Sequence, residues 1–184
     1  MNEIDQVIML FDKYGDSLYG GEAISQRDHA IQAAMLAENE NANPALIVAA
    51  LLHDVGHLIH DLPEDASEKG IDDRHELLGE AYLESAFGPE VAIPVRLHVA
   101  AKRYLCAVDE HYGDQLSYAS QVSLRLQGGP FNIDEIQSFE NLPHWENAVR
   151  LRRWDDLAKV KGMVMPEIRH FAGYMKDVLE KKPQ

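Results

Sequence analysis

The segment from Ala45 to His57 reads ALIVAALLHDVGH and decides how the rest of the sequence is interpreted. An unbroken apolar run over 45–52 ends in His53 and Asp54, which predicts a buried helix with an imidazole and a carboxylate at its end. Burying both polar side chains is costly unless something pairs with them. A metal ion would pair with both, so this segment predicts a metal site.

Other predicted helices carry further side chains that could ligate the same metal site. Each of these side chains is an imidazole or a carboxylate, and they are His29, His75, His98 and Asp155. Nitrogen and oxygen ligands of this kind suit iron better than a thiolate set would. No thiolate set is available here, because Cys106 is the single cysteine.

The apolar periodicity is helical nearly throughout, and no strand pattern stands out. We therefore expect one all-α domain over residues 1–184, a helical bundle. Gly56 is expected to let the chain turn away from the buried helix, and polar residues 61–74 to form an exposed loop. The predicted helices cover approximately 4–14, 25–40, 43–54, 75–88, 90–104, 117–127, 144–159 and 166–180.

Two polar signals predict where helices begin. Ser25 with Asp28 three residues later resembles a capping box, and Asn43 followed by Pro44 is typical of a helix cap with proline in the first turn.

The charge of the chain restricts its partners. Lys and Arg number 17 and Asp and Glu 31, which gives a formal charge of −14. This argues against nucleic acid or an anionic membrane as the main partner, because both bind basic surfaces. A small anionic substrate remains compatible, since a few local cations and a metal outweigh a distant field. The single cysteine fits a reducing cytoplasm, and acidic residues in the N-terminal segment indicate neither a signal peptide nor a membrane span.

The spacing of the candidate ligands resembles a known pattern. His29, the pair His53–Asp54 and the distant Asp155 are similar to the H…HD…D pattern of the HD superfamily, in which phosphohydrolases cleave phosphate esters. His75 and His98 lie between the HD pair and Asp155 and would add a second metal position. The six-ligand set therefore resembles the diiron HD oxygenases.

Several further stretches resemble the phosphonate-cleaving HD oxygenases of the PhnZ/TmpB type. His57 also stands where inositol oxygenases typically have a lysine. The resemblance covers roughly residues 15–160, and its most specific motifs are HVAAKRYL and QGGP. The stretches are YGGEAI at 19–24, HVAAKRYL at 98–105, LSYAS at 116–120, QGGP at 127–130 and RRWD at 152–155.

The resemblance implies a mixed-valent Fe(II)/Fe(III) centre with dioxygen as co-substrate. It implies oxidative cleavage of the C–P bond of a 1-hydroxy-2-(amino or trimethylammonio)ethylphosphonate, which releases inorganic phosphate and glycine or glycine betaine. Asp54 would bridge the two irons. By this resemblance one iron takes His29, His53, Asp54 and Asp155, and the other takes His75, His98 and Asp54.

The same resemblance implies roles around the substrate. The implied catalytic residues, which also bind substrate, are Tyr19, Glu22, His57 and Lys102, and the further binding residues are Ser120 and Arg152. Tyr19 would occupy an open iron position until substrate displaces it, and Glu22 would attract the cationic end of the substrate.

Each of these residues also has a structural interpretation. Tyr19 and Glu22 could be turn surface, and Lys102 or Ser120 could be a solvated helix residue. His57 could orient a metal ligand, and Arg152 could orient Asp155 or form a surface salt bridge.

Three other functions share parts of this pattern. A metal-dependent HD phosphohydrolase acting on a phosphate ester or a nucleotide is the main alternative, but His75 and His98 with the HVAAK stretch favour the oxygenase. A catalytically silent metal-binding module is disfavoured because no ligand of the set is missing. Oxidation of a polyol, as in inositol oxygenase, is disfavoured by His57 and by the short chain.

Overall fold

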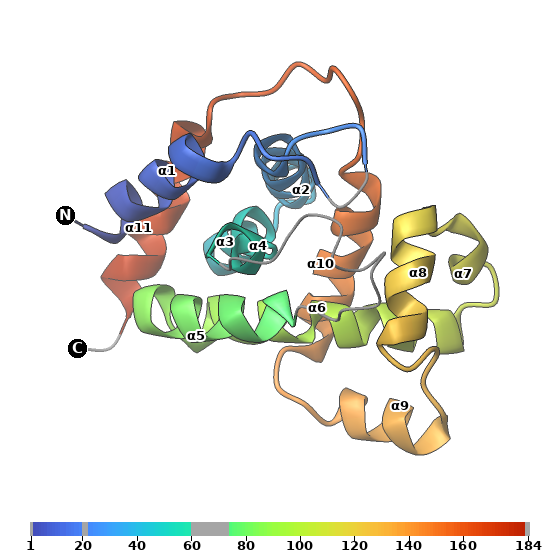
Figure 1. The fold of residues 1–184 in the computed structure, drawn as a ribbon. Coiled ribbons are helices and arrows are strands. Elements are labelled where there is room, and N and C mark those ends of the chain that lie inside the picture. Colours follow the sequence, from blue (N-terminus) through green and yellow to red (C-terminus); the bar gives the residue numbers. More distant parts are fainter. Residues whose placement is uncertain (1, 20–21, 60–73, 183–184) are drawn as a thin grey trace.

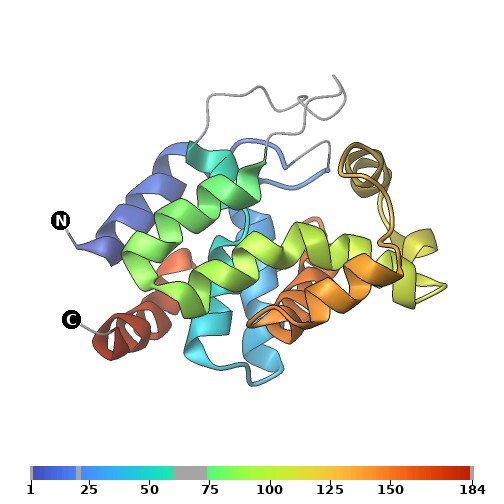
Figure 2. The same cartoon turned by 90° about the horizontal axis from the view of Figure 1, so that it is seen from below.

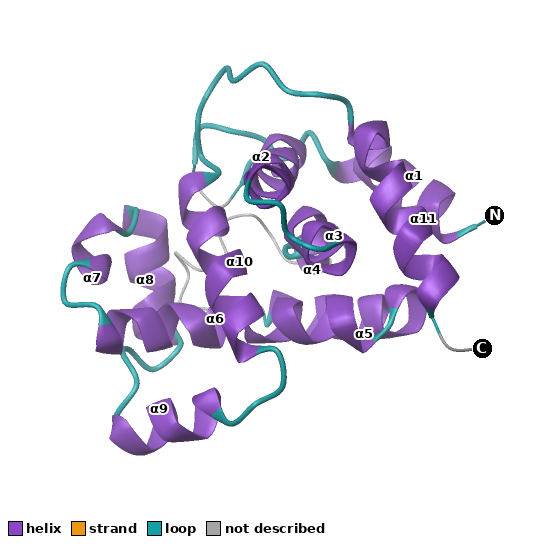
Figure 3. Cartoon of the chain, turned by 180° about the vertical axis from the view of Figure 1, so that it is seen from behind, coloured by secondary structure: helices purple, strands orange, loops and turns teal. Residues whose placement is uncertain are grey.

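The computed structural model describes residues 2–19, 22–59 and 74–182, and within these ranges the regular structure is helical (Figure 3). The predicted all-α class is confirmed; one isolated β-bridge pairs Leu18 with Ser25. The helices are α1 Glu3–Tyr14, α2 Gln26–Asn39, α3 Pro44–Leu52, α4 Val55–Ile59, α5 His75–Phe87, α6 Pro89–Val108, α7 Tyr112–Gln115, α8 Tyr118–Leu126, α9 Ile133–Glu140, α10 Trp145–Leu157, the 3₁₀ turn η1 Ile168–Phe171 and α11 Ala172–Lys181.

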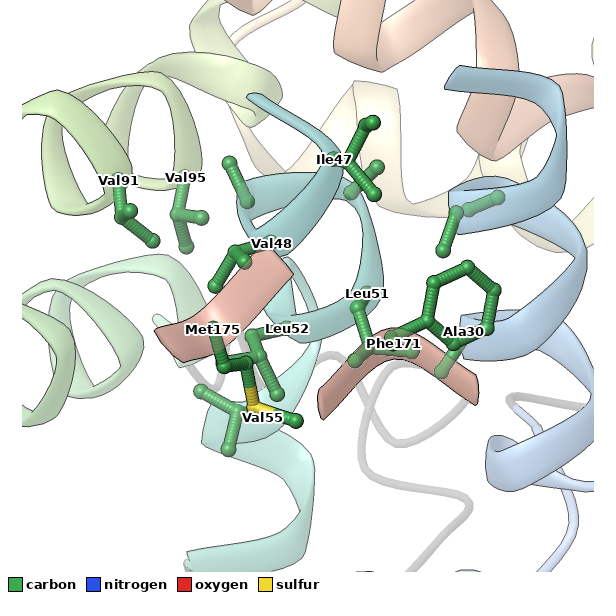
Figure 4. Close-up of a cluster of buried hydrophobic side chains, with 14 of the residues drawn as sticks. Ala30, Ile47, Val48, Leu51, Leu52, Val55, Val91, Val95, Phe171 and Met175 are labelled. Carbon is green, nitrogen blue, oxygen red and sulfur yellow. The ribbon is translucent and has the colours of Figure 1, made fainter. Parts of the chain in front are cut away.

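Helix α3 lies at the centre of the molecule, and α2, α6, α10 and α11 pack around it (Figure 1). Its start follows the prediction, since the Asn43 side chain accepts a hydrogen bond from the backbone N–H of Leu46 and Pro44 occupies the first turn. Every residue from Ala45 to Leu52 is buried, and side chains such as Leu51 contact the core on all sides (Figure 4). The hydrophobic effect thus holds α3 and the residues that follow it in the interior.

Helix α6 connects two hydrophobic clusters. Val91 and Val95 of α6 belong to the main core around α3, and Leu97 and Leu105 belong to a smaller cluster with residues of α7, α9 and α10. Figure 2 shows α6 as the long yellow-green helix that runs across the molecule. His98 lies in α6 between Val95 of the main core and Ala101 of the smaller cluster, and its imidazole is buried. None of the described helices is long and apolar enough to cross a membrane.

Most predicted boundaries agree with the structure within a few residues. Helix α6 extends one turn beyond the predicted end, and the last predicted helix begins as the 3₁₀ turn η1. The short helices α7 and α9 were not predicted, although the Asn132–Glu135 capping box that opens α9 is a recognisable signal. The predicted loop lies outside the described residues except for Arg74.

The expectation for Gly56 is wrong. The chain continues past Gly56 as helix α4, and this glycine is not among those with positive φ. Its absent side chain matters for a different reason, because a Cβ atom built on Gly56 would lie 2.0 Å from the backbone oxygen of His75. The glycine therefore permits the start of α5 to approach α4 closely, and this approach brings His75 to the segment that contains His53 and Asp54.

We expect Gly56→Ala to destabilise the protein, because the added methyl group meets backbone that cannot move without shifting α5. Overpacking of this kind costs about 1–3 kcal/mol, which thermal unfolding measures as a lower Tm. Gly173→Ala in α11 is the matched control, since a Cβ there meets nothing within 4 Å. Equal melting temperatures for the Gly56 and Gly173 variants would contradict the close-approach argument.

Candidate metal centre

The six predicted ligands come from five segments and converge at the end of α3, and all six are buried. Helix ends and helix interiors both contribute, so the site depends on the packing of the whole bundle. His29 lies in α2, His53 and Asp54 join α3 to α4, His75 begins α5, His98 lies in α6 and Asp155 lies in α10.

The first group of ligand atoms surrounds the Nε2 atoms of His29 and His53, which lie 3.0 Å apart. Asp54 Oδ2 lies 3.6 Å from His29 Nε2 and 3.5 Å from His53 Nε2. Asp155 Oδ1 lies 3.3 Å from His29 Nε2 and 3.8 Å from His53 Nε2. Two ligands each about 2.1 Å from one metal lie roughly 3–3.5 Å apart. His29, His53 and Asp54 therefore form one group that could hold an ion, and Asp155 Oδ1 lies beside its two imidazoles.

The second group uses the other oxygen of Asp54. Oδ1 lies 3.4 Å from His75 Nε2 and 3.5 Å from His98 Nε2, and the two imidazole nitrogens lie 3.2 Å apart. Two groups of three ligands can therefore each hold a metal ion, and Asp54 belongs to both. A carboxylate whose oxygens face different imidazole pairs has the geometry of a bridging ligand.

The tautomers of the imidazoles also favour a cation. In three of the rings Nδ1 faces a backbone carbonyl, which only accepts hydrogen bonds, so Nδ1 carries the proton and Nε2 presents a lone pair. The distances are 2.8 Å from His29 to Ala158, 2.8 Å from His53 to Ala50 and 2.6 Å from His98 to Val95. In the neutral rings the Nε2 lone pairs of His29 and His53 would face each other at 3.0 Å, which is repulsive unless a proton or a metal cation lies between them.

The carboxylates make this position strongly attractive for positive charge. Burial opposes a charged imidazole, yet Asp54 and Asp155 raise the pKa of His53 to about 9. Burial also opposes ionisation of Asp54, but the neighbouring imidazoles, His53 first, hold its pKa well below the ordinary value. The same field would stabilise a metal cation.

Arg152 is buried, so the surface salt bridge considered for it is excluded. Its Nη1 lies 2.7 Å from Asp155 Oδ2, its Nε donates to Tyr112 Oη at 3.2 Å, and Nη2 pairs with Asp156. Burial opposes ionisation of Asp155, but Arg152 holds the pKa of that carboxyl well below its usual range. Arg152 thus pairs with Oδ2 of Asp155, and Oδ1 of the same carboxylate faces the imidazoles.

Tyr19 and His57 flank the ligands. The Tyr19 ring stacks on His29 with centroids 3.8 Å apart, and its hydroxyl donates to Asp155 Oδ1 at 3.2 Å. Burial, followed by the charge of Asp155, raises the pKa of Tyr19 well above its ordinary value. The half-buried His57 stacks on His75 with centroids 4.0 Å apart. Both predicted residues thus contact a ligand imidazole, one at each group.

Lysines face a row of serines on α8. Lys102 is buried, and its Nζ donates to Ser123 Oγ at 2.7 Å. Lys159 follows α10, and its Nζ lies 3.3 Å from Ser120 Oγ and 3.4 Å from Ser117 Oγ. Lys102 and Ser120 are predicted site residues, whereas Lys159, Ser117 and Ser123 were not predicted. The spacing of three serines at i, i+3 and i+6 places them on one helical face and is the signal that could have found them.

Burial, and then the positive charge of Arg152, lower the pKa of Lys102 to about 7. Glu22, the remaining predicted site residue, lies beside Lys159, with Oε1 at 3.6 Å from Nζ. The structure thus places every predicted substrate residue beside a metal ligand or in this lysine–serine arrangement. Tyr19, His57 and Arg152 each contact a predicted ligand, and Lys102, Ser120 and Glu22 belong to the lysine–serine arrangement.

A helical bundle in which a histidine–aspartate pair gathers ligands from four other segments is typical of HD-domain metalloproteins. The HD domain family model matches residues 27–127, a range that contains five of the six ligands, all but Asp155. The chain belongs to the HD-domain family.

Two similar proteins have informative names. A hydroxymethylphosphonate dioxygenase of Gimesia maris is 42% identical over 178 residues, which cover 96% of this chain and 88% of the relative. A glycine-betaine-forming [1-hydroxy-2-(trimethylamino)ethyl]phosphonate dioxygenase of Leisingera caerulea is 37% identical over 98% of this chain and 92% of the relative. An uncharacterised protein of Acanthamoeba polyphaga mimivirus is 33% identical over 97% of this chain. The resemblance to phosphonate-cleaving HD oxygenases is confirmed.

We expect about two metal ions per chain after anaerobic purification, because Asp54 belongs to two complete groups. His75→Ala should lose one metal preferentially, whereas Asp54→Ala should lose both. Elemental analysis of the purified variants measures this, with the exposed His111→Ala as control. One tightly held zinc per chain in an active protein would contradict the two-metal site.

Proposed function

We propose that this chain is a non-haem diiron dioxygenase of organophosphonate catabolism that cleaves the C–P bond of a 1-hydroxyphosphonate and releases inorganic phosphate. The observation that carries the proposal is the carboxylate of Asp54, whose two oxygens face separate imidazole pairs. The names of the two dioxygenase relatives support the substrate class. Residues 1–184 would act as one HD domain in the cytoplasm.

The metals of this proposal are two irons, Fe²⁺ and Fe³⁺. Imidazole and carboxylate donors suit iron, and the described ligand set contains no thiolate. His29, His53, Asp54 and Asp155 would hold one iron, and His75, His98 and Asp54 the other. When bound, the two irons would chelate the hydroxyphosphonate and activate dioxygen next to it.

The reaction balances with dioxygen as the only oxidant. The hydroxyl-bearing carbon becomes a carboxylate carbon, the C–P bond breaks, and phosphorus leaves as inorganic phosphate. A 2-amino or 2-trimethylammonio substituent on the substrate would give glycine or glycine betaine. Hydroxymethylphosphonate, which has no such substituent, would give formate.

The protein residues around this reaction have separate roles in the proposal. Lys102 and Ser120 bind the phosphonate oxygens, and His57 donates to them from beside His75. Tyr19 stays on Asp155 until substrate enters. Glu22 faces the substituent of the substrate, where a carboxylate attracts a cation.

We expect phosphate release from 1-hydroxyphosphonates to require dioxygen, since the carbon is oxidised in the same reaction. The measurement is phosphate formed by iron-loaded protein with and without oxygen, and His98→Ala should abolish it. Equal turnover without oxygen would instead support a metal-dependent phosphohydrolase acting on a phosphate ester or a nucleotide.

We expect Lys102→Met to weaken binding of hydroxymethylphosphonate by at least about tenfold, the typical loss for a charged hydrogen-bond partner. Because the pKa of Lys102 is lowered to about 7, its positive charge is present below that pH and is lost as pH rises through it. The contribution of Lys102 to affinity should therefore shrink above pH 7. Dissociation constants of both proteins at pH 6 to 9 measure this, with exposed Lys176→Met as control. If the affinities of the wild-type protein and Lys102→Met differ by the same factor at every pH, the pKa of Lys102 is not lowered.

A further inference from the structure

Glu22 has an incompletely satisfied carboxylate. Among the described residues, its Oε1 atom is buried and accepts no hydrogen bond. The cation beside this oxygen is Lys159, whose Nζ lies 3.6 Å away, within ion-pair range but longer than a hydrogen bond. A buried oxygen in this state favours the arrival of a donor or a positive charge.

The same ammonium group of Lys159 faces three other site residues. It lies 3.3 Å from Ser120 Oγ and 3.4 Å from Ser117 Oγ, and 5.7 Å from the centre of the Tyr19 ring. Lys159 thus stands between the serines of the proposed phosphonate contacts and the carboxylate that would face a cationic substituent.

The backbone next to Lys159 is held firmly. The Gln32 side chain of α2 donates to the carbonyl of Val160 at 2.9 Å and accepts from its N–H at 2.9 Å. Only 14% of the Lys159 side chain is exposed. Its position near Glu22 therefore follows from the packing of the segment after α10 against α2, and not from a freely mobile surface side chain.

We propose that Lys159 is a specificity-determining residue that offsets the charge of Glu22 and competes with a substrate ammonium for that carboxylate. The inference rests on the proposed function. An ammonium placed on Glu22 Oε1 meets the like charge of Lys159, whereas a substrate without a cation does not. Lys159 therefore shifts the balance of affinity away from cationic hydroxyphosphonates.

A simpler role would make a different prediction. If Lys159 only binds the phosphonate group, next to Ser120, its removal lowers the affinity for every hydroxyphosphonate by the same factor. If it offsets Glu22, its removal changes the ratio of affinities for cationic and uncharged substituents.

The experiment measures anaerobic dissociation constants of hydroxymethylphosphonate and (1-hydroxy-2-aminoethyl)phosphonate for iron-loaded wild type and variants. Lys159→Met should shift the affinity ratio about fivefold toward the amino compound, the range expected for a partly exposed ion pair. Lys159→Arg should keep the wild-type ratio, and exposed Lys161→Met is the matched control. In a Glu22→Gln background, Lys159→Met should leave the ratio unchanged.

An equal loss of affinity for both compounds in Lys159→Met would overturn the inference, as would a shift that persists without Glu22. The binding ratio needs no turnover, so it separates this inference from the proposed function. Both compounds could bind to the wild-type protein without release of phosphate in the presence of oxygen. In that case the proposed function fails, but the ratio of the two affinities still tests the pairing of Lys159 with Glu22. A wild-type protein that binds neither compound overturns both.

Discussion

The carboxylate of Asp54 imposes the constraint on which the rest of the structure depends. Its two oxygens face imidazole pairs that come from both sides of the central helix, His29 with His53 and His75 with His98. Such an arrangement concentrates negative charge and nitrogen lone pairs in a buried place, which is unfavourable without cations. The packing of α2, α6 and α10 around α3, and of α5 on α4 and α6, therefore serves to hold this cluster together, and bound metals would in turn stabilise the fold.

Backbone groups support this cluster as much as side chains do. The carbonyl of Ala158 orients His29, and that of Val95 orients His98 within its own helix. Arg152 holds one oxygen of Asp155 so that the other faces the imidazoles. Lys159 lies in the segment after α10, which Gln32 of α2 holds in place, and its ammonium group lies beside the carboxylate of Glu22. In the proposed function, metal ligation and substrate selection would thus depend on the same packing between α2 and α10.

Much of the fold could be predicted because the decisive signals are local. The continuous apolar run of α3, the Asn43–Pro44 start and the Ser25 cap each predict structure from neighbouring residues, and all three agree with the structure. Helix α7 was not predicted because four residues are too few to show a helical period. Gly56 was misinterpreted because its importance comes from a residue 19 positions away, His75, whose backbone approaches it.

The sequence by itself determined the helical class, the buried end of α3 and the identity of the candidate ligands, because residue chemistry and periodicity are local properties. The resemblance implied a bridging Asp54 and left more than one interpretation of Arg152. Only the tertiary structure shows that the two oxygens of Asp54 face separate imidazole pairs, that Arg152 pairs with Asp155, and that Lys159 faces Glu22. These relations join residues up to 137 positions apart, as for Glu22 and Lys159. Side-chain direction at such separations depends on how helices pack, and spacing along one chain contains no measure of that packing.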